Sequence, residues 1–200
     1  QGAMRAVLRC QRFARQHPYA LKADIWKFYP TLDHGALLAI LRRRVRDPRV
    51  LRLVEDVLAS WQSDPGLYYR QFPEDDLLSI LRPRGIPIGN LTSQFFANVA
   101  LAELDAFARR RLGVGAYVRY MDDVLLFADD REALRAWKRE MARALEPLRL
   151  ALHPEKCHLL RTADGVPFLG FRVLPGRRLL LRAGVRRFVR RTRWQMREVE

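Results

Sequence analysis

The sequence is poor in cysteine and has no long apolar run. Cys10 and Cys157 are too few for a disulfide framework, which indicates a reduced, cytoplasmic protein. No apolar run reaches the roughly 20 residues that cross a bilayer, so we expect no membrane partner. The N-terminus also lacks the pattern of a secretory signal peptide.

Acidic residues are scarce relative to basic ones. The chain has 22 Asp and Glu against 37 Lys and Arg, a net charge of +15. Arginine supplies most of this excess and binds phosphate in a planar, bidentate geometry. Nucleic acid is therefore the first partner to expect. Since 49% of the 200 residues are apolar, the composition is that of a globular protein with a substantial core.

The pattern with the strongest chemical content lies at residues 117–127. Two short runs rich in aromatic, β-branched and aliphatic residues flank Met121, Asp122 and Asp123. This predicts a β-hairpin with the three residues at its turn. Two like charges between apolar strands are costly unless neutralised, and a divalent cation with oxygen ligands neutralises them. The alternative is a solvated turn, since Asp is common in turns.

A further carboxylate follows the apolar segment 19–23. Asp24 is expected at the end of a strand, either as a ligand in a two-metal site or as a cap or ion-pair partner. Tyr29, five residues on, is placed either beside a bound sugar or in the core.

Other acidic residues have structural explanations. Asp33 is the expected N-cap of a helix over 34–46. Asp75 and Asp76 are interpreted as surface residues, because no alternating strands flank them. Asp129 and Asp130 are expected at the start of a helix that runs to residue 145.

A His/Cys cluster follows near the end of the chain. His153, Cys157 and His158 lack a second ligand cluster at a suitable spacing, so we expect no zinc site. Lys156, between them, is either an ordinary exposed lysine or a mobile general acid.

Periodicity predicts the remaining elements. Helices are expected at 4–16, 50–61, 92–111 and from 185, and strands at 148–152, 166–173 and 178–182. The helix at 92–111 is expected to bury Phe95 and Phe96. The loop before it, residues 82–94, contains Gly85 and Gly89, which permit close backbone approach by a ligand.

Four blocks in this order resemble the palm domain of reverse transcriptases. They are Asp24 on a strand, the glycine loop before a helix, the Tyr-Met-Asp-Asp hairpin of residues 120–123, and the Phe-Leu-Gly-Phe ribbon of residues 168–171. The resemblance implies an α+β fold with an antiparallel sheet packed on helices, an RRM or ferredoxin-like core. The implied domains are a fingers remnant (1–18), a palm (19–165) with a helical insertion at about 34–82, a primer-grip ribbon (166–184) and the start of the thumb (185–200).

The same resemblance assigns roles to residues. Asp24, Asp122, Asp123 and the Ile25 backbone carbonyl would bind two Mg²⁺ ions, which Mn²⁺ can replace. Lys156 would protonate the pyrophosphate leaving group, and Tyr29 would exclude a ribose 2′-hydroxyl. The implied nucleotide-binding residues are Ile25, Trp26, Lys27, Phe28, Tyr29, Ile88, Gly89 and Gln94, and the implied primer grip is Phe168, Leu169, Gly170 and Phe171.

The implied activity is RNA-directed DNA synthesis, with template RNA, primer or cDNA, and dNTPs as partners. The loop 88–94 looks like that of reverse transcriptases from diversity-generating retroelements, which work with a small basic accessory protein. Ile88 there replaces a polar residue, which is consistent with looser nucleotide selection. The alternatives are a retron-like or defence-associated reverse transcriptase, or a non-catalytic basic module that binds nucleic acid.

The resemblance also suggests an origin and an extent. It favours a bacterial or phage-type protein. Both ends look cut, because the chain opens and stops within basic helical segments, and most of the fingers and thumb are missing. We therefore expect a fragment that polymerises poorly by itself.

Overall fold

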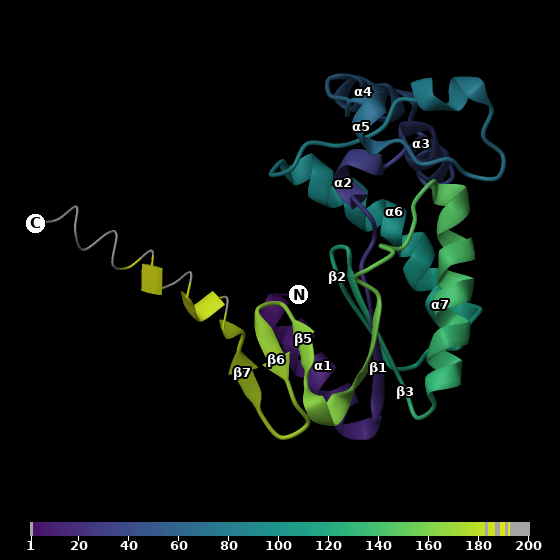
Figure 1. The fold of residues 1–200 in the computed structure, drawn as a ribbon. Helices are drawn as coiled ribbons and strands as arrows, with labels where there is room; N and C mark the ends of the chain where they lie inside the picture. The colour runs from purple at the N-terminus through teal and green to yellow at the C-terminus, as the bar shows by residue number, and fades with distance from the viewer. Residues whose placement is uncertain (1, 183, 187–188, 191, 193–200) are drawn as a thin grey trace, which may run out of the picture.

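The computed structural model describes residues 2–182, 184–186, 189, 190 and 192 (Figure 1). Its centre is an antiparallel four-stranded sheet in the order β2-β3-β1-β4. The strands are β1 (Tyr19–Ala23), β2 (Tyr117–Tyr120), β3 (Asp123–Ala128) and β4 (His158–Arg161). The long helices α6 (Leu91–Arg110) and α7 (Arg131–Leu145) pack together, and α7 also contacts β1 and β3. The chain order β-α-β-β-α-β in this sheet is the ferredoxin-like arrangement, as expected.

The second face of the sheet is also covered. Helix α1 (Ala3–Gln16) packs against β2, β3 and the ribbon strand β6 (Figure 1). The ribbon is a separate sheet of β5 (Val166–Phe168), β6 (Phe171–Val173) and β7 (Arg178–Leu180). Because β3 is covered on both faces, its side chains alternate between two cores: Val124 and Leu126 belong to the core below α6 and α7, and Leu125 and Phe127 to the core with α1. This explains why the strand reads as a continuous apolar run.

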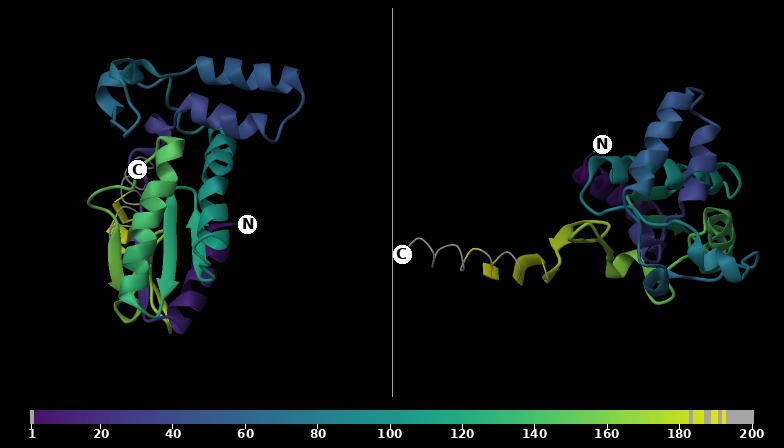
Figure 2. Two further views of the ribbon diagram at one scale, coloured as in Figure 1. Left: turned by 90° about the vertical axis from the view of Figure 1, so that its right-hand side faces the viewer. Right: turned by 90° about the horizontal axis from the view of Figure 1, so that it is seen from above.

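A helical insertion follows β1 and lies across one end of the central unit (Figure 2). It contains α2 (Phe28–Thr31), α3 (His34–Arg42), α4 (Pro48–Ala59), α5 (Pro65–Tyr68) and the 3-10 helix η1 (Leu77–Leu81). Asp33 caps α3 as predicted, by accepting a hydrogen bond from the Ala36 N–H at 2.8 Å. Pro48 begins α4, because Asp47 caps this helix and proline is well suited to the first helical position.

The predicted strand at 148–152 is wrong. These residues follow α7 through the 3-10 turn η2 (Glu146–Leu148), and Arg149 then adopts a left-handed conformation with φ of 54° that redirects the chain. Only Leu152 forms a bridge, with Ile25. The edge strand of the sheet is instead β4, which begins six residues later. The 3-10 helix η3 (Thr162–Asp164) connects β4 to the ribbon.

Two further expectations change in the structure. Phe95 was expected to be buried in α6, but its side chain is 58% exposed, because it lies on the outer side of the first helical turns. The basic helix expected from residue 185, the start of the thumb, lies largely outside the described residues. In the part of the chain that the structure describes, no helix combines the length and apolar character needed to cross a bilayer.

Candidate active site

The hairpin of β2 and β3 places two carboxylates at its turn, as predicted. Tyr120 pairs with Asp123 across the turn, and Met121 takes a left-handed φ of 55°. The Arg119 guanidinium supports this turn by donating to the Met121 carbonyl at 3.0 Å and to both oxygens of Asp105 on α6 at 2.7 Å. This pair was not predicted. Its only sequence signal was a charged residue within an apolar strand.

The carboxylate of Asp24 lies at the same end of the sheet. Ala23 pairs with Val124, so Asp24, the first residue after β1, lies beside Asp123, the first residue of β3. Burial raises the pKa of Asp122 above its usual value, and the nearby negative charges of Asp24 and Asp123 raise it further. The structure therefore brings together the three carboxylates that the sequence singled out.

Two lysines lie beside these carboxylates. The Lys22 Nζ is 3.5 Å from Asp123 Oδ1, and the Lys156 Nζ is 3.6 Å from Asp24 Oδ2. The Lys156 side chain is 63% exposed. The ammonium groups offset part of the repulsion between the carboxylates. Lys22 was not predicted, although its alternation with Leu21 and Ala23 on β1 places it on the other face of the strand from them.

The backbone around Asp24 is held from both sides. The Asp24 carbonyl accepts from the His153 N–H at 2.8 Å, and the Trp26 N–H donates to the Ala151 carbonyl at 2.8 Å. Ile25 lies between these two hydrogen bonds, opposite Leu152, so neither bond uses its carbonyl. No hydrogen bond to the Ile25 carbonyl is found among the described residues, which fits the predicted role of Ile25 as a backbone ligand.

The donor set fits ions that arrive with a substrate. Within the described residues, no three Asp, Glu, His or Cys side chains converge to hold an ion by themselves. Mg²⁺ in nucleotide-handling sites keeps several waters and is bound by one or two carboxylates together with substrate phosphates. Clustered carboxylates with few fixed ligands are consistent with that mode of binding.

Comparison with known proteins identifies the family. The family model described as reverse transcriptase (RNA-dependent DNA polymerase) matches residues 3–173. The chain is a member of the reverse transcriptase family. The central sheet with α6 and α7 is thus the palm of a reverse transcriptase.

Curated relatives are distant and longer. Protein YkfC of Escherichia coli (strain K12) is 25% identical over 189 residues, a match that covers 78% of this chain and 47% of the relative. A putative COX1/OXI3 intron 2 protein of Saccharomyces cerevisiae is 22% identical over 110 residues, covering 55% of this chain and 12% of the relative. The chain therefore spans less than half the length of the relatives it matches.

Solved telomerase structures share the fold. Apo telomerase from Candida tropicalis, truncated from its C-terminal domain, aligns with a TM-score of 0.61 at 13% identity, covering 90% of this chain and 39% of that one. Telomerase from Candida albicans in complex with a fragment of telomeric RNA aligns with a TM-score of 0.59 at 12% identity, covering 91% of this chain and 34% of that one. At these identities the likeness shows the fold.

The segment after Asp24 has only part of the predicted nucleotide-binding surface. Phe28 is 2% exposed and belongs to the core, so only its backbone is accessible to a nucleotide. Tyr29 is half-buried and packs edge-on against Phe28. Burial raises the pKa of its phenol, and the nearby negative charge of Asp122 raises it further. Trp26 is half-buried and Lys27 is exposed, with a left-handed φ of 45°. The role of Tyr29 against a 2′-hydroxyl stays a prediction.

The two glycines of the loop before α6 differ. A Cβ on Gly85 would lie 2.2 Å from the Ser63 hydroxyl, so the close approach there is to the protein itself and not to a ligand. Gly89 has open space around it and a φ of +103°. Ile88 is 81% exposed, and Gln94 is also exposed. The accessible part of the predicted nucleotide pocket is therefore the second half of this loop.

The ribbon turn contains the predicted primer grip. Phe168 is 1% exposed and fills the core with α1, and Phe171 opposite it is half-buried. Leu169 and Gly170 form the turn, with φ of 47° and 84°. Only this turn is presented for contact with nucleic acid, and its function as a primer grip stays a prediction.

Asp75 was predicted to be a surface residue, and this is wrong. Its side chain is fully buried and accepts hydrogen bonds from the Tyr69 hydroxyl at 3.2 Å and the Phe72 N–H at 2.9 Å. It also forms an ion pair with Arg149, the residue that redirects the chain after α7. The two residues are far apart in sequence, so no local pattern indicated the pair. Asp76 is exposed, as predicted, and caps η1.

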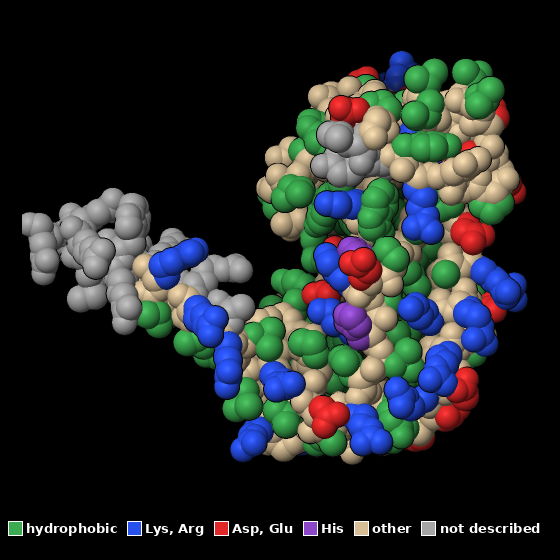
Figure 3. Space-filling model, in the orientation of Figure 1, with side chains coloured by type: hydrophobic (Ala, Val, Ile, Leu, Met, Phe, Trp, Pro, Cys, Tyr) green, Lys and Arg blue, Asp and Glu red, His purple; other side chains and the backbone are tan. Residues whose placement is uncertain are grey.

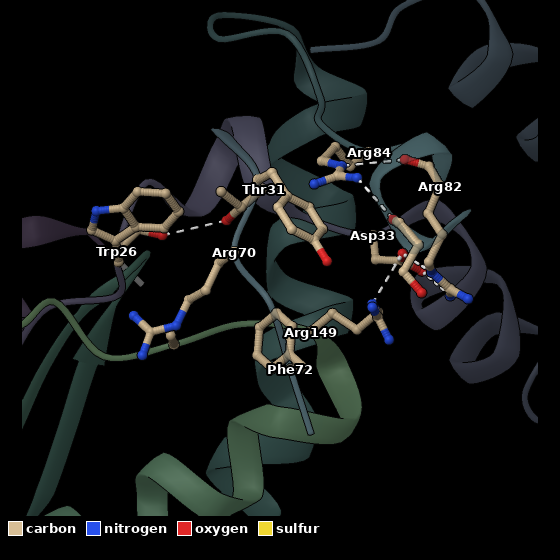
Figure 4. Close-up of a pocket in the computed structure, with 11 residues that line it drawn as sticks. Trp26, Thr31, Asp33, Arg70, Phe72, Arg82, Arg84 and Arg149 are labelled. Carbon is tan, nitrogen blue, oxygen red and sulfur yellow. Dashed lines mark hydrogen bonds and ion pairs between the residues drawn. The ribbon is translucent and has the colours of Figure 1, made fainter. Parts of the chain in front are cut away.

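Arg149 also belongs to a network with Asp33 and Arg82, in a pocket that Trp26 lines as well (Figure 4). Arg149 lies 3.7 Å from Asp33, whose two oxygens accept from the Arg82 guanidinium at 2.8 and 2.9 Å. Burial alone would raise the pKa of Asp33, but these hydrogen bonds and charges hold it below its usual value. The network ties the helical insertion to the segment whose backbone holds Asp24.

The remaining sequence predictions concern acidic caps and the His/Cys cluster. Asp130 caps α7 by accepting from the Ala133 N–H at 3.1 Å, as predicted, and Asp129 pairs with His17 at 2.9 Å. Cys157 is buried with its Sγ 3.7 Å from the Asp24 carbonyl. It therefore packs against the backbone of the active site.

Proposed function

We propose that this chain is the catalytic palm of an RNA-directed DNA polymerase. The observation that carries this proposal is that Asp24, Asp122 and Asp123 lie near one another at one end of the palm sheet, where burial and the charges of the other two raise the pKa of Asp122. Such a cluster is costly for a merely structural protein but useful for binding cations. The telomerase neighbour in complex with RNA supports an RNA template as the partner.

In the proposed reaction, Asp24, Asp122 and Asp123 would hold two Mg²⁺ ions. Such ions would supply Lewis-acid activation of a hydroxyl nucleophile and would offset the negative charge that develops during nucleotidyl transfer. Lys156 is exposed and can leave Asp24 to donate its proton to the pyrophosphate leaving group. Lys22 stays on the sheet and orients Asp123. Tyr29, next to Asp122, packs beside the sugar of the incoming dNTP.

We further propose the diversity-generating type. Ile88 is almost fully exposed beside Gly89 and offers no hydrogen bond to a nucleotide, which supports loose selection at this position. A retron-like or defence-associated enzyme is the competing subtype. The similarity to a yeast protein named for an intron adds an intron-associated enzyme as a further alternative.

The test is primer extension on an RNA template with Mg²⁺. It uses this chain and, in parallel, the longest polypeptide that its gene encodes, with any accessory protein encoded beside it. The paired variant Asp122→Asn/Asp123→Asn is the inactive control, and Asp164→Asn, at an exposed residue of η3, is the control for loss of a surface negative charge. We expect cDNA from the parent and from Asp164→Asn, and none from the paired variant.

Sequencing of the cDNA separates the subtypes. Errors concentrated at template adenines support the diversity-generating type, and Ile88→Gln is then expected to reduce them. Faithful copying indicates a retron-like or intron-associated enzyme. If the folded proteins bind RNA but make no metal-dependent product, the polymerase proposal is wrong and a non-catalytic binding module remains.

A further inference from the structure

A second concave surface lies away from the carboxylates. It is a groove of about 930 Å³ between β4 and the outer face of the ribbon. The register places Pro167, Arg172 and Leu179 in one row across the ribbon, on the opposite side from the buried Val166 and Val173. This row has no covering element in the part of the chain that the structure describes. Leu179 is 45% exposed there.

The opposite wall of the groove is an open strand edge. In the sheet order, β4 is terminal and pairs only with β1 among the described residues. An edge strand presents unpaired N–H and C=O groups, which are a template for an added strand. The groove wall also includes Leu159 and Leu160 of β4 and Leu181 after β7. An apolar surface therefore lies directly beside a backbone edge.

The described lining of the groove is mostly basic. Arg131, Arg161, Arg172 and Arg182 line it, and Asp164 is the one acidic residue among the described lining residues. Arg161, Arg172 and Arg182 have no carboxylate at ion-pair distance within the described residues, whereas Arg42, Arg44, Arg82 and Arg149 in or beside the insertion do. Figure 3 shows basic side chains spread over this lower part of the molecule, with hydrophobic ones between them. The surface is complementary to negative charge.

The chemistry of the lining favours a peptide over a nucleic acid. Single-stranded nucleic acids stack their bases on aromatic rings, and among the described residues the lining contains leucine, proline and arginine but no aromatic residue. Peptides that add a strand obtain affinity from main-chain hydrogen bonds and selectivity from alternate side chains. A four-residue edge of about 13 Å matches a short extended segment.

We propose that this groove docks an acidic, leucine-containing segment of a partner protein as an added strand along β4. Alternate apolar side chains of the segment pack against Pro167, Leu179 and the leucines of β4. Its acidic side chains pair with Arg161 and Arg172. A basic partner would be repelled here, so this partner differs from the basic accessory protein expected from the loop at 88–94. The proposal does not depend on polymerase activity.

The test is binding of a fluorescein-labelled peptide in which Glu or Asp alternates with Leu or Val, followed by fluorescence anisotropy. Arg161→Glu/Arg172→Glu reverses two charges in the groove and is expected to weaken binding about tenfold or more. The matched control is Arg52→Glu/Arg178→Glu, because Arg178 pairs with Val173 and so lies on the other face of the ribbon, and Arg52 is exposed on α4 in the helical insertion. We expect this control to retain the peptide affinity within about threefold, because a charge change away from the groove acts on the peptide only through screened, long-range electrostatics.

Two further measurements decide the mode and the ligand class. A peptide N-methylated at alternate residues is expected to lose binding, because it cannot donate to the β4 edge. No saturable binding, equal weakening by both paired variants, or full binding of the N-methylated peptide would overturn the proposal. The proposal would also be overturned if a single-stranded RNA displaced the peptide and only the groove variant weakened the binding of that RNA, since the groove would then bind nucleic acid. Melting temperatures of both paired variants verify that they fold.

Discussion

At the scale of single residues, Asp122 is a carboxylate whose charged form is disfavoured by burial and by the neighbouring charges of Asp24 and Asp123. Its folded pKa is raised, so the native state binds the proton more tightly than the unfolded state does. The destabilisation is therefore absent below the ordinary pKa of 3.8 and fully present above the folded pKa. The same carboxylate is predicted to bind cations, so function and stability oppose each other at this position.

This predicts that Asp122→Asn is more stable than the parent at neutral pH in the absence of divalent metal. The melting temperature should rise by about 2–4 °C for each kcal/mol gained in a chain of this size. The difference should shrink as the pH falls toward 3.8, where the parent carboxylate is protonated. Thermal melts across this pH range in a chelating buffer measure it. A variant that is less stable at neutral pH would contradict the assigned cause.

Divalent metal should reverse this order. We expect Mg²⁺ or Mn²⁺ to raise the melting temperature of the parent, because an ion that binds only the native state stabilises it by mass action. Asp122→Asn should show little or no rise. Asp164→Asn serves as the control for a lost surface charge. If the parent and Asp122→Asn gain equally from the metal, the stabilising ion binds elsewhere.

The Asp75–Arg149 pair predicts a large stability effect. Arg149→Met leaves the Asp75 carboxylate buried without a cation, and removing one partner of a buried pair costs roughly 3–5 kcal/mol. Arg143→Met is the matched control. Arg143 forms an exposed ion pair with Glu140 on α7, and such a pair contributes less than about 1 kcal/mol to the free energy of unfolding. Urea unfolding of the two variants gives the comparison. Similar midpoints would mean that Asp75 is accessible to water in solution.

At the scale of elements, the loop before α6 offers a contrast between two glycines. Gly85→Ala places a Cβ 2.2 Å from the Ser63 hydroxyl and 2.6 Å from the Trp61 ring, in addition to the strain of a positive φ. Gly89→Ala meets the strain alone, which costs of order 1–3 kcal/mol. We therefore expect Gly85→Ala to lower the melting temperature clearly more than Gly89→Ala. The reverse order would show that this loop has another conformation in solution.

Local sequence patterns correctly predicted the elements that depend on contacts between residues close together in the sequence. The hairpin of β2 and β3 was predicted because two apolar runs flank a polar turn, and the caps Asp33 and Asp130 because a cap interacts with the next few residues. The strand at 148–152 failed for the opposite reason. Its alternation of leucine and other residues fits a strand, but Leu150 is buried against α7, where its N–H donates to Leu145. Packing of a helix end overrode the local preference.

At the scale of the whole molecule, the charge of +15 predicts strong dependence of RNA binding on salt. Each neutralised phosphate releases counterions, so a surface that contacts 6–10 phosphates loses roughly 10³–10⁵ in affinity between 50 and 200 mM salt on duplexes, and somewhat less on single strands. Filter binding of a single-stranded RNA over this range measures the slope. A flat dependence would assign the excess arginines to a role other than phosphate contact.

The sequence by itself determined the family, the ferredoxin-like palm and the three carboxylates, because these depend on short blocks whose order and spacing are visible along the chain. Only the tertiary structure decided what surrounds them. The pairing of Asp75 with Arg149, the support of the hairpin by Asp105 and Arg119, the burial of Phe168, and the groove beside β4 all join segments that are distant in sequence. Such contacts follow from the packing of whole elements, and the residues involved have no local pattern that distinguishes a buried partner from a solvated one.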